Sequence, residues 1–113
     1  MPPLRRPSGS RGVAHRVGFD PAAREELREL YAHIASRSGS PDIAERYIRR
    51  IVDWCLRLAD APERGSRHDE VRPGLRSMGF ENRVTIAFVV EAETVTILRV
   101  LYGGRDTRSI LGS

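Results

Sequence analysis

The stretch 71–106, VRPGLRSMGFENRVTIAFVVEAETVTILRVLYGGRD, predicts three consecutive β-strands. Its middle part, 83–91, is rich in β-branched and aromatic residues and is largely apolar at both parities, which is typical of a central strand. Residues 75–80 and 94–102 form the neighbouring strands, and the short polar connections between the three favour hairpins. The rest of the chain must therefore supply a layer that covers this sheet.

Two helices are predicted before the sheet. Asp20 followed by Pro21, and Ser40 followed by Pro41, each combine an N-cap residue with a proline in the first turn. Gly39 closes the first helix, and a break this short predicts an antiparallel helical hairpin. Apolar residues recur at helical spacing in both segments: Leu27, Leu30, Tyr31 and Ile34, then Ala44, Tyr47, Ile48, Ile51, Cys55 and Leu58.

A further short strand is expected at 13–19, and the polar stretch 62–73 is expected to be a loop. The predicted fold class is therefore α+β, in the order β-α-α-β-β-β, with a helical hairpin packed on one face of a mostly antiparallel β-sheet. Residues 13–113 form a single domain. Residues 1–12, MPPLRRPSGSRG, are expected to be a disordered basic arm because they cannot bury a core.

The composition limits the classes of function. The chain has 113 residues and a formal net charge of +4, and residues 1–16 hold four arginines and no acid, so the remainder is neutral. Direct nucleic-acid binding is therefore expected to be weak or absent. No apolar run approaches the roughly 20 residues of a membrane helix, so no membrane association is expected.

The chain has one cysteine, Cys55, which excludes an intrachain disulfide and is typical of a cytoplasmic protein. Cys55 falls on the apolar stripe of the second helix, where a thiol is expected to be inert. The spacing of the histidines with acids and the cysteine matches no metal site, and neither a metal nor another cofactor is expected.

Two arginines interrupt the apolar strands. Arg99 lies in step with Val95, Ile97 and Leu101, where a guanidinium is costly unless it is paired or faces an open groove. One interpretation is a groove lined by Arg76 and Arg99 on the face of the sheet that the helices leave open, with Arg105 at its rim. The alternative is that both arginines are structural and tether acids such as Asp106, Glu81 or the C-terminal carboxylate.

Four motifs in this order and at these separations resemble the RelE/ParE superfamily, the toxins of type II toxin–antitoxin pairs. They are FDPAA at 19–23, LADAPERG at 58–65, VRPGLR at 71–76 and ILRVLYGGRD at 97–106. The second, third and fourth are more similar to the ParE branch. The resemblance covers 13–111, nearly the whole predicted domain.

The ParE resemblance implies a toxin that inhibits DNA gyrase by binding, without enzymatic chemistry of its own, and that a cognate ParD-like or similar antitoxin neutralises. An uncovered sheet face and edge would suit such a partner, whose toxin-binding segment typically folds on binding. The target-binding groove expected from the resemblance comprises Arg72, Arg76, Arg99, Tyr102 and Arg105.

Two alternatives remain open. The first is a RelE-like, ribosome-dependent mRNA endoribonuclease. In that case the catalytic candidates are Arg76 and Arg99, which would hold phosphate, with Tyr102 or Arg105 assisting proton transfer. The second is an inactive relative retained as a partner of an antitoxin.

Overall fold

The computed structural model describes residues 15–103, and the predicted basic arm at 1–12 lies outside them. Within this range the chain forms one short strand, a helical hairpin and four further strands, a three-residue 3₁₀ turn following the second helix. The elements are β1 (Arg16–Phe19), α1 (Pro21–Ser38), α2 (Pro41–Leu56), η1 (Arg57–Ala59), β2 (Ser66–Arg67), β3 (Leu75–Phe80), β4 (Val84–Val90) and β5 (Thr94–Tyr102).

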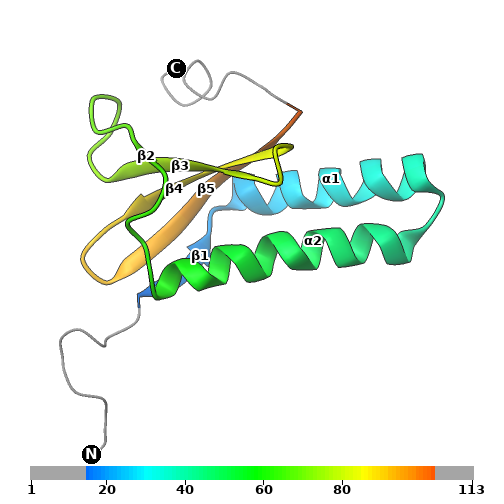
Figure 1. Ribbon diagram of the computed structural model, residues 1–113, viewed down its shortest axis with the longest axis horizontal. Coiled ribbons are helices and arrows are strands. Elements are labelled where there is room, and N and C mark those ends of the chain that lie inside the picture. The colour runs from blue at the N-terminus through cyan, green and yellow to red at the C-terminus, as the bar shows by residue number, and fades with distance from the viewer. Residues whose placement is uncertain (1–14, 104–113) are drawn as a thin grey trace, which may run out of the picture.

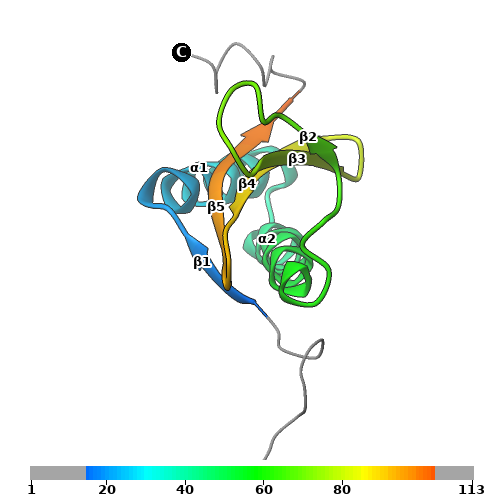
Figure 2. The same cartoon turned by 90° about the vertical axis from the view of Figure 1, so that its left-hand side faces the viewer.

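The strands form one sheet in the order β1-β5-β4-β3-β2. The β1 strand runs parallel to β5, and every other neighbouring pair is antiparallel. The two helices lie side by side as a hairpin on one face of this sheet (Figures 1 and 2). The predicted fold class, element order and mostly antiparallel sheet are therefore confirmed.

The helices begin and end where the capping residues predict. The Asp20 carboxylate accepts a hydrogen bond from the Ala22 N–H at 3.1 Å, and the Ser40 hydroxyl accepts one from the Ile43 N–H at 3.3 Å. Gly39 takes a left-handed conformation with φ of 71° and donates its N–H to the Ala35 carbonyl. These local interactions fix the tight reversal that brings the two helices together.

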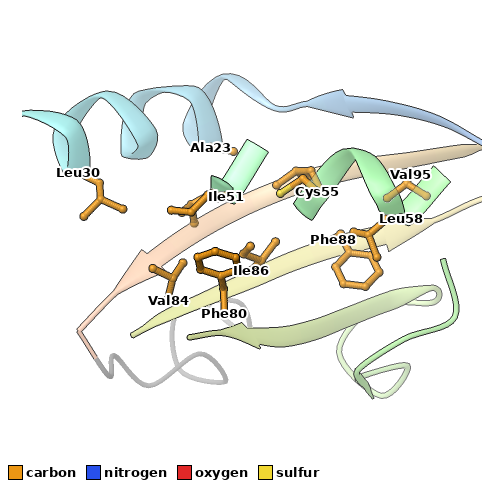
Figure 3. Close-up of a cluster of buried hydrophobic side chains, with 12 residues drawn as sticks. Ala23, Leu30, Ile51, Cys55, Leu58, Phe80, Val84, Ile86, Phe88 and Val95 are labelled. Atoms are coloured by element: carbon orange, nitrogen blue, oxygen red, sulfur yellow. The ribbon is translucent and has the colours of Figure 1, made fainter. Parts of the chain in front are cut away.

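The main core fills the space between the helical hairpin and the sheet (Figure 3). Phe80 belongs to this core, and the rings of Tyr47 and Trp54 meet its ring edge-on at centroid distances of 6.1 and 6.2 Å. Tyr31, at the margin of the predicted apolar stripe, is instead 37% exposed. The fully buried members of this core are Ala23, Ile51, Cys55, Leu58, Val84, Ile86, Phe88, Val95 and Ile97.

The stretch 62–73 is not entirely a loop, because it contains β2, which pairs antiparallel with β3 and forms the far edge of the sheet. Ser66 and Arg67 show no apolar alternation, so a strand could not be predicted for them from the residue pattern. Gly65 leads into this strand with φ of 79°, and a Cβ atom at this position would overlap the Ser77 carbonyl oxygen.

The turn between β3 and β4 is held from outside the sheet. Glu81 and Asn82 both have positive φ, at 51° and 59°, and lie at the centre of a β-turn in which the Arg83 N–H donates to the Phe80 carbonyl oxygen at 3.1 Å. Arg50 of α2 donates to both oxygens of the Glu81 carboxylate, at 3.2 and 2.9 Å. This ion pair ties the middle of α2 to the end of the hairpin.

Gly65→Ala should destabilise the fold more than Gly39→Ala. Both substitutions put a side chain at positive φ, which costs about 1 kcal/mol, but only at position 65 does the new Cβ also meet backbone. We expect a loss of about 1 kcal/mol for Gly39→Ala and at least about 2 kcal/mol for Gly65→Ala, measured by urea unfolding. Equal losses would show that β2 adapts to the added methyl group.

Burial raises the pKa of the Cys55 thiol to about 12, so the native protein should react with a thiol reagent at pH 8 only through unfolding. The raised value means that the fold favours the neutral thiol. The neutral Cys55 thiol therefore contributes to the free energy of unfolding. This contribution is complete below the unfolded pKa of about 8.5 and is lost as pH rises toward about 12. Fast labelling of the native protein, at a rate independent of added urea, would contradict this placement.

Candidate functional site

Along one edge of β5, the first half of the strand pairs with β1 and the second half binds a side chain of α1. The β1 strand pairs with residues 94–97, and the Asp20 N–H makes the last contact, 2.9 Å from the Ile97 carbonyl oxygen. There the chain turns into α1. The Glu26 side chain, from the second turn of α1, then accepts a hydrogen bond from the Val100 N–H at 2.8 Å through its Oε1 atom. A carboxylate thus takes the place of a strand at this edge.

The other oxygen of Glu26 binds Arg99. Its Oε2 atom accepts from Nε and Nη2 of Arg99 at 2.9 and 2.6 Å. The Glu26 side chain is only 14% exposed and that of Arg99 31%, so this ion pair is more shielded than the other four among residues 15–103. The hydrogen bonds that Arg99 donates to Glu26 raise the pKa of Arg99, although partial burial acts in the opposite direction.

A β-bulge in β5 determines the face of the sheet on which Arg99 lies. Ala87 pairs with Arg99 and Phe88 pairs with Ile97, so Leu98 is an extra residue in β5. The sequence pattern placed Arg99 in step with Val95 and Ile97, and this was wrong because the bulge reverses the alternation. Val95 and Ile97 point into the helix-side core, whereas Arg99 lies on the opposite parity. Its structural partner is Glu26, which the sequence analysis did not identify.

Arg76 lies on the other face of the sheet. It pairs with Phe88 and is in step with Met78 and Phe80, which belong to or pack against the helix-side core. Its Nη1 atom donates to the Arg64 carbonyl oxygen at 3.2 Å, beyond the end of η1. The structure therefore does not bring Arg76 and Arg99 together in one groove.

Tyr102 also faces the helices, where it packs against the core and meets His33 of α1 at a ring-centroid distance of 5.6 Å. Both rings line a cleft of about 260 Å³ together with Glu26, Glu29, Leu30 and Val100. Tyr102 is thus close to Glu26 but lies on the opposite parity of β5 from Arg99. The proximity of His33 was not predicted, because 69 residues separate it from Tyr102 and it lies outside the apolar stripe.

The same two rings also line a second cleft, of about 460 Å³. It is bounded by Ile34, Arg37 and Ser38 of α1 and by Arg83 at the start of the β4 region. Neither Arg37 nor Arg83 has an ion pair within residues 15–103. We call the first cleft, which contains Glu26 and Glu29, the acidic lobe, and the second, which contains Arg37 and Arg83, the basic lobe. His33 and Tyr102 line both.

Arg72 is exposed in the turn that leads into β3. Asp69 organises this turn by accepting from the Gly74 N–H at 3.0 Å and from Arg67 Nε at 2.8 Å. These contacts, the Gly74 hydrogen bond first, lower the pKa of Asp69. Arg105, the remaining predicted site residue, lies outside the described residues.

In the part of the chain that the structure describes, no three His, Cys, Asp or Glu side chains gather in a way that could hold a metal ion. Nor does any helix between residues 15 and 103 have the length and apolar character to cross a bilayer.

The fold is shared with solved toxin–antitoxin proteins. A structure of the chromosomal ParDE TA system from P. aeruginosa matches 80% of this chain and 97% of its own, with a TM-score of 0.68 and 22% identity. A structure of the toxin-antitoxin complex RelBE2 from Mycobacterium tuberculosis matches 86% of this chain and all of its own, with a TM-score of 0.58 and 21% identity.

Sequence comparison assigns the chain to the ParE branch of the superfamily. The family model of the ParE toxin of the type II toxin-antitoxin system parDE matches residues 17–107. Toxin ParE1 of Mycobacterium tuberculosis is 31% identical over 94 residues, which cover 83% of this chain and 95% of that protein. This chain belongs to the ParE family of type II toxin–antitoxin toxins, as its sequence motifs indicated.

Glu26→Ala should destabilise the fold, because it leaves the Val100 N–H and the partly buried Arg99 guanidinium without their acceptor. We expect a loss of about 2–3 kcal/mol in urea unfolding, given the usual contribution of hydrogen bonds to charged groups. Glu29→Ala is the matched control, one turn along α1 and without a hydrogen-bond partner in the described chain, and should cost under about 0.5 kcal/mol. Similar losses in both variants would contradict the role assigned to Glu26.

Proposed function

We propose that this chain is a toxin that inhibits DNA gyrase by binding it, and that a cognate antitoxin neutralises it. Family membership supports the toxin class. The observation that favours binding over catalysis is the separation of the two strand arginines. Arg99 is held by Glu26, and Arg76 lies on the opposite face.

Phosphodiester cleavage needs cations and a proton donor or acceptor that converge on one phosphate. Arg99 has its positive charge neutralised by a shielded carboxylate, so it is poorly suited to hold a second anion. Arg76 is separated from Tyr102 by the width of the sheet from β3 to β5. These positions support a toxin whose arginines contact its target or stabilise its fold, and do not catalyse phosphodiester cleavage.

The surface proposed for the target is the end of the sheet around the β2–β3 turn, where Arg72 and Arg76 lie. Arg72 is exposed, and Asp69 holds the turn that carries it through its hydrogen bond to Gly74. A preorganised exposed arginine is a typical anchor in a protein interface. Tyr102, Arg99 and Arg105 were also expected in this groove, and of these Arg99 has a structural role in the fold.

For the antitoxin, the support comes from the similar solved structures, which are of the ParDE TA system from P. aeruginosa and the toxin-antitoxin complex RelBE2. The two-residue edge strand β2 leaves sheet edge available for an added strand. An antitoxin that folds on this domain would also limit access to the surface around Arg72.

The direct test is gyrase supercoiling in vitro with the purified chain. We expect inhibition, weakened about tenfold in Arg72→Ala, which corresponds to about 1.4 kcal/mol of binding. Arg49→Ala is the control, because Arg49 is an exposed α2 arginine paired with Glu45. Supercoiling that is unaffected by a large molar excess of folded protein would refute gyrase as the target.

One observation favours a second candidate, the RelE-like mRNA endoribonuclease. Tyr102 has a histidine against its ring, and the cleft that it lines also holds two arginines, Arg37 and Arg83, that form no ion pair among residues 15–103. Programmed ribosomes separate the two functions. Cleavage of mRNA that is lost in Tyr102→Phe, with unchanged thermal stability, would establish the nuclease, and intact mRNA would exclude it.

A further inference from the structure

Beyond its target and antitoxin, we propose that the basic lobe between α1 and the start of β4 binds the phosphate group of a nucleotide. This lobe is the cleft of about 460 Å³ lined by His33, Ile34, Arg37, Ser38, Arg83 and Tyr102. Its volume is that of a small-ligand site. It brings together two elements that the sequence separates widely, the end of α1 and the strand that follows the Glu81–Asn82 turn.

The charge of this lobe is available to a ligand. Arg28, Arg49, Arg50, Arg67 and Arg99 each form an ion pair with a carboxylate. Arg37 and Arg83 form none within residues 15–103, although they line the same cleft. Guanidinium groups match phosphate oxygens in geometry and are the usual phosphate ligands of proteins.

Both arginines are needed to bind a phosphate group in the basic lobe, because the last turn of α1 lies beside this lobe. The C-terminal end of a helix carries a partial negative charge that opposes an anion, and Arg37 lies in that last turn. One guanidinium offsets the helix end, and the second supplies net attraction. Loss of either one should therefore remove most of the binding.

A buried hydroxyl outside the lining of this cleft interacts electrostatically with two of the residues that line it. The Tyr47 OH group is buried and has no hydrogen-bond partner among residues 15–103, which is uncommon in folded proteins. Burial first, and then Glu81 and Tyr102, raise the pKa of Tyr47, while the nearby charge of Arg83 acts in the opposite direction. The phenol that lacks a partner thus lies within electrostatic reach of Arg83 and Tyr102, two of the residues that line the basic lobe.

The adjoining acidic lobe indicates the class of molecule that carries the phosphate. It is lined by Glu29 and Glu26 and shares the rings of His33 and Tyr102 with the basic lobe. Glu26 is occupied by Arg99 and Val100, but the Glu29 carboxylate has no partner in the described chain. It can accept hydrogen bonds from an amino or hydroxyl group, which nucleotides present at the end remote from phosphate.

A long nucleic acid fits this arrangement poorly. Two guanidiniums give a short basic surface, and the carboxylates beside it would repel the next phosphates of a strand. A mononucleotide places its single charged group at the arginines and its neutral part past the two rings. The observations therefore favour a small nucleotide.

The test is calorimetric titration of the purified chain with ATP and, separately, with inorganic pyrophosphate. We expect saturable binding of ATP, weakened at least tenfold in Arg37→Ala and in Arg83→Ala. Arg49→Ala, an arginine on α2 paired with Glu45, should bind like the unmodified chain. Thermal melting of each variant checks the fold.

Comparing ATP with pyrophosphate shows whether the site recognises a nucleotide or only its phosphate groups. Weaker binding of pyrophosphate than of ATP, with Glu29→Ala affecting only ATP, assigns a nucleotide, whereas equal binding assigns the phosphate group alone and refutes the nucleotide. No saturation at about 1 mM of either ligand, or affinities unchanged in both arginine variants, would overturn the site. Because gyrase is absent from this assay, its result is independent of the proposed function.

Discussion

The Glu26 carboxylate is the interaction on which the arrangement of helix and sheet depends. A parallel edge strand that ends after four residues leaves the backbone of its neighbour unpaired, and an unpaired buried N–H is costly. Glu26 accepts from Val100 at this position and binds Arg99 with its other oxygen. A single side chain thus fixes the start of α1 against the last strand and sets where the hairpin of helices lies.

Most of the fold could be predicted from the sequence because its signals are local. Asp20-Pro21 and Ser40-Pro41 mark the helix starts through contacts within three residues, and the apolar density of β4 marks a central strand. The site could be predicted only in part, because its geometry depends on the Leu98 bulge. Nothing local identifies Leu98 as the extra residue. The bulge lies where β1 leaves the sheet, which only the folded chain determines.

The long-range partners were missed for the same reason. The position of Arg99 in an apolar strand correctly predicted that its guanidinium would be paired or would face an open groove. The sequence could not identify Glu26 as the partner from among fifteen acidic residues. His33 lies outside the apolar stripe of α1 and so gave no signal, and it lies beside Tyr102 only because α1 packs on β5. Residue types predicted the kind of interaction, whereas the pairing of elements determined the partners and divided the arginines between two faces of the sheet.

The pairing of β1 with β5 has a consequence for synthesis of the chain. These strands lie near opposite ends of the described sequence, so their contact is of high sequence separation and closes a long loop. During translation β1 and the helical hairpin leave the ribosome well before β5, and until then the core has no complete sheet to pack on. Formation of the native domain therefore has to follow completion of β5, which delays the appearance of a folded toxin relative to the start of its synthesis.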